Sequence, residues 1–145
     1  MVTMVILIVG LLAVASATTS TSLLRKRGIQ EDAVFNAMLG QMNWVRGELY
    51  SDSDFHAATM DGLATGAEYS QSFLLDADGD GQQDMSATAG DNQTPILQVT
   101  VSAADGVDDS SVAVQVDVNA SWYGVSGVRT RTLGALIANR RGYDD

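Results

Sequence analysis

The chain begins with an uncharged apolar run over its first seventeen residues, from Met1 to Ala17. About 17 to 25 apolar residues in a helix can cross the hydrocarbon core of a bilayer, so this run lies at the lower limit of a spanning helix. Ala15-Ser16-Ala17 also has the small-x-small form of a signal-peptide cleavage site, although no basic residue precedes the run. A third interpretation is a helix that leaves lipid to pack against copies of itself, which requires an apolar surface on all sides.

Length and charge limit the remaining classes of protein. The 145 residues fit one domain with a modest core. Eight Lys and Arg against 18 Asp and Glu give a net charge of -10, which repels phosphate backbones, so we expect no nucleic-acid binding through a basic face. There is no cysteine, and the single histidine, His56, has no recognisable nucleophile or metal-ligand partner in the sequence. We therefore expect that the protein is not an enzyme.

Helical periodicity continues after the apolar run. Spacings of three and four residues place Phe35, Met38, Met42, Val45 and Leu49 on one stripe, which predicts an amphipathic helix over 29–50. With the apolar half, 1–28, it forms one long rod that ends near Tyr50 and leads into a globular part, 29–145.

Polar residues mark two further local structures. Ser53 or Asp54 is the predicted cap of a short helix over 54–64. The hydroxyl residues Thr18 to Ser22 can bond back to carbonyls about four residues earlier in hydrocarbon, and we expect partial melting around 16–22 in a polymer.

The second half of the chain switches to a period of two. Apolar and polar side chains alternate over 96–103, 112–122 and 128–137, with the valine-rich middle segment closing on Trp122. Short links between these segments predict an antiparallel meander, whose apolar face the helical stripe covers. The predicted fold class is α+β, with a long N-terminal helix packed on a small antiparallel sheet.

An acidic loop over 76–84 is the clearest motif for metal binding. Oxygen-bearing side chains at alternate positions can converge on one hard cation such as Ca²⁺, and Gly81 permits the tight turn. Position 12 of the motif is Ala87 instead of a bidentate Glu, so this is not a full EF-hand. The predicted calcium ligands of this weak site are Asp76, Asp78, Asp80, Gln82 and Asp84.

Two segments carry a family resemblance. Met4-Val-Ile-Leu-Ile-Val-Gly10-Leu-Leu-Ala-Val-Ala15 resembles the interior of the N-terminal helix of type IV pilins and pseudopilins, especially the minor-pilin branch. Val116-Asp-Val-Asn-Ala-Ser-Trp122, Gly127-Val-Arg-Thr-Arg131-Thr-Leu133 and Leu136-Ile-Ala138 are similar to the C-terminal part of the same branch. Family members carry a glutamate at the fifth position after leader cleavage. With Gly10 aligned to the family's glycine, that glutamate lies upstream of Met1, and we expect a start assigned slightly too late.

This resemblance implies a structural subunit of an extracellular type IV pilus-like filament. Such a subunit is held in the inner membrane before assembly and then forms a helical homopolymer of identical subunits at the cell surface. Assembly would use Val5, Ile6, Leu7, Ile8, Val9, Gly10, Leu11, Leu12 and Val14. Two alternatives stay open: a minor pseudopilin at the tip of a type II secretion or uptake machine, and a secreted calcium-binding module cleaved after Ala17.

Overall fold

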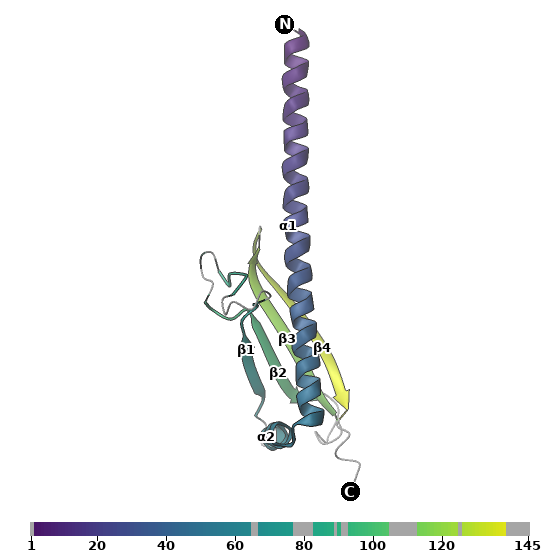
Figure 1. Ribbon diagram of the computed structural model, residues 1–145, viewed down its shortest axis with the longest axis vertical. Coiled ribbons are helices and arrows are strands. Elements are labelled where there is room, and N and C mark those ends of the chain that lie inside the picture. The colour runs from purple at the N-terminus through teal and green to yellow at the C-terminus, as the bar shows by residue number, and fades with distance from the viewer. Residues whose placement is uncertain are drawn as a thin grey trace.

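The structure, a computed structural model, consists of one long helix with a small sheet packed against its C-terminal half (Figure 1). It describes residues 2–64, 67–76, 83–88, 90, 93–104, 113–124 and 126–138. The two helices are α1 (Val2–Ser51) and α2 (Ser53–Ala64), and the four strands are β1 (Tyr69–Phe73), β2 (Leu97–Ala103), β3 (Ala113–Gly124) and β4 (Gly127–Ala138). This arrangement confirms the predicted α+β class.

The sheet is a meander in which each strand pairs with the next strand in sequence. Its order is β1-β2-β3-β4, and all three pairings are antiparallel. Strands β2, β3 and β4 coincide with the three predicted alternating segments to within two residues at each end. Strand β1 was not predicted, because its three central residues are polar and the sequence shows no alternation of apolar and polar side chains there. In the structure these three residues, Ser70, Gln71 and Ser72, are exposed.

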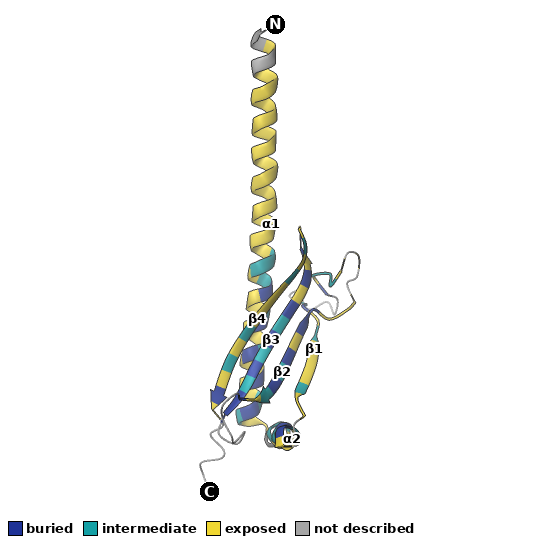
Figure 2. Ribbon diagram, turned by 180° about the vertical axis from the view of Figure 1, so that it is seen from behind, coloured by how far each residue is buried: buried dark blue, intermediate teal, exposed yellow. Residues whose placement is uncertain are grey.

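The core lies between the lower half of α1 and one face of the sheet (Figure 2). Alternate residues of β2 and β3 point towards the helix, as the period of two predicts, and Trp122 is the largest fully buried side chain. The buried residues at this interface are Val34, Met38, Met42, Val45 and Leu49 of α1, Leu97, Val99 and Val101 of β2, and Val114, Val116, Val118, Ala120 and Trp122 of β3.

For one residue of the helical stripe, the prediction of burial in the core is wrong. Phe35 is 51% exposed, whereas Val34, which the stripe omits, is completely buried. A shift of one residue rotates the side chain by about 100° around a helix, so the face towards the sheet is centred slightly off the predicted line. Phe35 instead borders a hollow between α1 and β4 that also contacts Met38 and Leu133.

The junction between α1 and α2 is a single residue outside both helices, Asp52. Its Oδ1 atom accepts hydrogen bonds from the backbone N–H groups of Asp54 (2.9 Å) and Phe55 (3.1 Å). Asp52 is therefore the cap of α2, and the prediction of Ser53 or Asp54 was one or two residues late. An edge-to-face contact between Trp44 and Phe73 (5.5 Å between ring centroids) joins α1 to β1.

Candidate functional site

The N-terminal half of α1 projects from the domain without any cover (Figure 2). The helix contains one stretch long and apolar enough, by length and composition, to cross a membrane, and none of that stretch is buried in the chain. Of the predicted assembly residues, Leu7 to Leu12 and Val14 are exposed. Val5 and Ile6 lie in α1, but their side chains are outside the described part of the structure.

The exposed apolar surface is large enough to require a partner or a lipid environment. Nine large apolar side chains between Met4 and Leu24 are each at least 43% exposed. Burying a surface of this kind stabilises an assembly by on the order of 10 kcal/mol, which is comparable to the cost of fixing one protein copy against another. The helix half is therefore the strongest candidate for a binding surface on this chain.

The hydroxyl segment that follows is helical throughout. Each hydroxyl from Thr18 to Ser22 donates a hydrogen bond to a backbone carbonyl three or four residues earlier, at 2.8 to 3.0 Å. Each hydroxyl of the segment therefore has a backbone acceptor and could lie in hydrocarbon without an unpaired donor. This is the back-bonding that the sequence predicts. Partial melting of the helix around 16–22 in a polymer stays a prediction.

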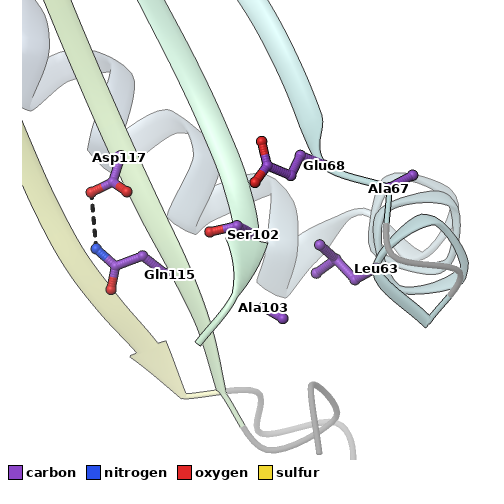
Figure 3. Close-up of a pocket in the computed structure, with 7 residues that line it drawn as sticks. All are labelled: Leu63, Ala67, Glu68, Ser102, Ala103, Gln115 and Asp117. Carbon is purple, nitrogen blue, oxygen red and sulfur yellow. Dashed lines mark hydrogen bonds between the residues drawn. The ribbon is translucent and has the colours of Figure 1, made fainter. Parts of the chain in front are cut away.

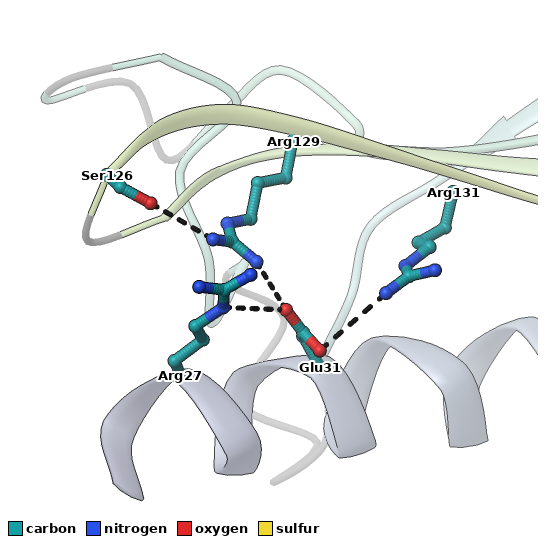
Figure 4. A network of polar contacts seen from close by, with 5 residues as sticks. All are labelled: Arg27, Glu31, Ser126, Arg129 and Arg131. Carbon is teal, nitrogen blue, oxygen red and sulfur yellow. Dashed lines mark hydrogen bonds and ion pairs between the residues drawn. The ribbon is translucent and has the colours of Figure 1, made fainter. Parts of the chain in front are cut away.

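A polar network joins α1 to β4 at the level where the helix leaves the sheet (Figure 4). Glu31 is its centre: Arg27 Nε lies 3.2 Å from Glu31 Oε1, Arg131 Nη2 lies 3.7 Å from Glu31 Oε2, and Arg129 Nη1 donates to Oε1. Arg129 Nη2 also donates to Ser126 Oγ at 3.0 Å. Three guanidinium groups thus share one carboxylate, and the network keeps an excess of positive charge.

The electrostatic effect on Glu31 follows from these contacts. The hydrogen bond from Arg27 is the largest influence, and together with the charges of Arg27, Arg129 and Arg131 it holds the pKa of Glu31 below its ordinary value of 4.5. Partial desolvation of the carboxyl acts in the opposite direction but is outweighed. Glu31 is therefore ionised at neutral pH and anchors the helix to the last strand.

The described ends of the acidic loop are held together. The N–H of Asp84 donates to the carbonyl of Leu75 (2.8 Å), so residues 76 and 84 are brought near each other at the base of the loop. Buried Gln83 donates through Nε2 to the carbonyl of Thr94 (2.7 Å) and accepts from the N–H of Ile96 (3.1 Å).

Only part of the predicted ligand set can be placed. Asp78, Asp80 and Gln82 lie outside the described residues, whereas Asp76 is half-buried and Asp84 exposed. Among the residues that are described, no group of three or more His, Cys, Asp or Glu side chains could hold a metal ion. The calcium site therefore stays a prediction.

The sheet also borders a hollow of about 400 Å³ near the end of α2 (Figure 3). Its polar wall includes Glu68, Ser102 and Gln115, and Gln115 Nε2 donates to Asp117 Oδ1 at 2.9 Å. Leu63, Ala67 and Ala103 complete the lining. These side chains pair no base with an activated nucleophile, so the geometry of this hollow suggests no reaction.

Sequence reasoning missed two features of this site. The contacts of Glu31 with Arg129 and Arg131 bridge about a hundred residues, and nothing local to either segment indicates them. The role of Gln83 as a bridge to Thr94 and Ile96 is similarly non-local. Strand β1 had a weak signal, since Tyr69 and Phe73 are its two half-buried residues and lie four positions apart.

No protein-family model matches the chain, and no match was found among curated proteins or solved structures. The arrangement itself is nevertheless specific: a long apolar N-terminal helix continues without interruption into a domain where it packs on an antiparallel sheet. This is a pilin-like layout.

Proposed function

We propose that this chain is a non-enzymatic structural subunit of an extracellular type IV pilus-like filament. Its apolar helix half is held in the inner membrane before assembly and then packs against the same half of identical subunits in a helical homopolymer. Leu7 to Leu12 and Val14 carry the assembly contacts in this proposal, together with Val5 and Ile6.

The observation that carries the proposal is the continuity of α1. The helix runs unbroken from Val2 to Ser51 and continues through residue 28, the predicted boundary between its two halves. Its first half is exposed, and its second half packs on the core. A simple membrane anchor needs no fixed orientation towards its domain. A rigid rod fixes that orientation, so every copy presents the apolar half in the same geometry to its neighbours, which a helical polymer requires.

Two exposed leucines provide a matched test. Leu11 in the bare half of α1 and Leu136 on β4 are both 63% exposed, so each change to asparagine starts from a similar environment. We expect Leu11→Asn to abolish the fibres seen by electron microscopy after detergent removal, because burying an amide without a partner costs about 1–3 kcal/mol in every copy. Leu136→Asn is expected to assemble. Equal fibre yields from the two variants, or no fibres from the wild type, would refute the proposal.

The first alternative is a minor subunit at the tip of a type II secretion or uptake machine. The same helix and sheet serve that role, so abundance separates the two: a shaft subunit is recovered as purified fibres, and a tip subunit is not. The second alternative is a secreted module cleaved after Ala17. The mass of the mature N-terminal peptide distinguishes it from both pilin-like roles, because cleavage there removes most of the bare helix half.

We further propose that the 76–84 loop binds Ca²⁺ weakly. Support comes from the alternate acidic residues of the sequence and from the bond between Asp84 and Leu75, which closes the base of the loop. In a chain without cysteine, such an ion would replace a disulfide as a local crosslink.

A further inference from the structure

The two outer strands of the sheet, β1 and β4, each have one edge that no other strand covers. Among the described residues, β1 pairs with β2 alone and β4 with β3 alone (Figure 1). The one hydrogen bond described between the backbone of β4 and a group outside the sheet is at its last residue, where Tyr50 Oη donates to the carbonyl of Ala138 (2.9 Å). The backbone N–H and C=O groups that point away from the sheet along these edges can therefore pair with another strand.

Part of the β4 edge lacks the features that usually protect a free strand. Proteins block such edges with proline, lysine or other charged side chains. The charged residues of β4, Arg129 and Arg131, lie among its first five residues, and both are ion-paired with Glu31. The seven residues 132–138 carry no charge and no proline, and the same is true of the five residues of β1. The neutral part of the β4 edge is thus long enough to pair with the whole of β1.

The number of strands determines how a second copy can meet these edges. With four strands and antiparallel pairing throughout, β1 and β4 run in opposite directions. When a second copy stands beside the first in the same orientation, its β1 runs antiparallel to β4 of the first copy, which is the more stable kind of ladder. Antiparallel pairing of β4 with β4, or of β1 with β1, instead requires a two-fold axis across the strands and points the two apolar helix halves in opposite directions. Of the antiparallel arrangements, only β4 with β1 keeps all apolar halves at one end, as the proposed filament requires.

The register within the sheet shows which residues would meet. The pairings through β2 and β3 place Ser72 of β1 in the same row as Thr132 of β4, and Ser70 in the same row as Gly134. A second copy at the same level along the strands sets Ser72 opposite Thr132. A slip of one residue would turn every side chain to the other face, so any shift along the edge takes place in steps of two residues, or about 6.6 Å.

We propose that β1 of one copy adds to the free edge of β4 of the next copy, so that the sheets of successive copies join into one antiparallel sheet. This inference rests on the proposed polymer of identical subunits and names the contact between their domains. The contact is heterologous, so an open assembly ends in one free β1 edge and one free β4 edge. It uses backbone groups, so Leu136→Asn, which changes an exposed side chain, leaves it intact.

The absence of cysteine from the chain allows a direct disulfide test. Residues directly opposite each other in an antiparallel pair have Cβ atoms about 4.5–5.5 Å apart, close to the span of a disulfide. Ser72 and Thr132 of one chain are separated by three strand spacings, or about 14 Å, which excludes a bond between them within one copy. A disulfide between these positions therefore identifies contact between two copies.

The experiment mixes two single-cysteine variants of the full chain, removes the detergent and oxidises with copper phenanthroline. We expect Ser72→Cys mixed with Thr132→Cys to give a disulfide dimer that contains one copy of each, and the double variant to give a ladder of longer species on a gel. Each single variant alone should stay monomeric. Shifts of two residues are covered by three further mixtures: Ser72→Cys with Thr130→Cys, Ser70→Cys with Thr132→Cys, and Ser70→Cys with Leu136→Cys. Ser72→Cys mixed with Ser121→Cys is the matched control, because Ser121 is exposed but lies on β3, one strand inside the edge.

Two results would overturn the proposed contact. If none of the four mixtures yields more disulfide dimer than the Ser121→Cys control, the edges do not meet. If Thr132→Cys alone dimerises as readily as the mixture, β4 pairs with itself in a closed dimer. Electron microscopy of the same samples reports on the filament independently: mixed disulfides without fibres keep the strand contact and reject the filament, whereas fibres without mixed disulfides do the opposite.

Hydrogen exchange of the unmodified chain adds a measurement that needs no substitution. On assembly, the backbone N–H groups on the free edges of β1 and β4 gain a partner, so we expect their exchange to slow at least several-fold, at alternate residues along each strand. The amides of β3 are flanked by β2 and β4 in the single copy and serve as the internal control. Edge amides that exchange at the same rate before and after assembly would contradict the continuous sheet.

Discussion

The orientation of α1 on the sheet is tested by two neighbouring residues, Val34 and Phe35. Helical periodicity in the sequence selects Phe35 for the core, whereas the structure buries Val34 completely and leaves Phe35 half exposed. Because the larger side chain is the exposed one, the two arrangements predict opposite orders of destabilisation when each residue is changed to alanine.

The structure sets the magnitudes. Val34→Ala removes two buried methyl groups, and the transfer of each from water to the core contributes about 0.8 kcal/mol. The change also leaves a cavity, so we expect the free energy of unfolding to fall by about 2–3 kcal/mol. A fully buried Phe→Ala change costs about 3–5 kcal/mol, but Phe35 is half exposed and we expect about 1 kcal/mol. Val and Phe have similar helix propensities, so the gain from alanine cancels in the comparison.

Urea unfolding of the full chain in detergent micelles measures both values. Buried Trp122 lies in the same core and Trp44 of α1 contacts Phe73 of β1, so tryptophan fluorescence follows the loss of packing between α1 and the sheet. An unchanged dependence on urea concentration in the two variants would show that they unfold between the same two states. The reasoning fails if Phe35→Ala is the more destabilised variant.

Three further predictions concern charge, backbone conformation and metal binding. Because the pKa of Glu31 is lowered, its carboxylate stabilises the fold above pH 4.5, and this contribution is lost as the pH falls through the lowered value. The melting temperatures of the wild type and Glu31→Gln should therefore differ at pH 7 and converge in acid. Gly127 has a φ of +108°, which L side chains rarely adopt, so Gly127→Ala should cost about 1–3 kcal/mol of stability in the same melting assay. Isothermal titration should detect Ca²⁺ binding with a dissociation constant of about 10⁻⁴ to 10⁻³ M, and Asp78→Asn with Asp80→Asn should abolish it; a wild type that takes up no calcium at millimolar concentration would remove the metal site.

Most of the fold is predictable because its signals are local. Strand β3 alternates buried and half-buried or exposed residues along Val114 to Trp122, so the period of two directly marks the face that the core uses. The apolar run and the stripe that follows it likewise predict a helix to about Tyr50, and α1 ends at Ser51. In each case the side-chain pattern has the same period as the backbone.

The features that escaped prediction depend on contacts between distant segments. Strand β1 exists because it pairs with β2, since Gln71 lies opposite Val99 although its own neighbours are polar. Glu31 looks like an ordinary first-turn acid of an amphipathic helix, and only the placement of β4 gives it Arg129 and Arg131 as partners.

The sequence by itself determined the bare apolar helix, its extension into the domain and the alternating strands, because these follow from residue type and period. The tertiary structure alone decided where the face of α1 that meets the sheet is centred, since a rotation of about 100° separates adjacent residues and Val34, not Phe35, meets the core. It also decided the ion-pair partners of Glu31, because residues near 27 and 130 become neighbours only when β4 returns beside α1. Local periodicity specifies elements, whereas the packing of those elements specifies the surface that a second copy would meet.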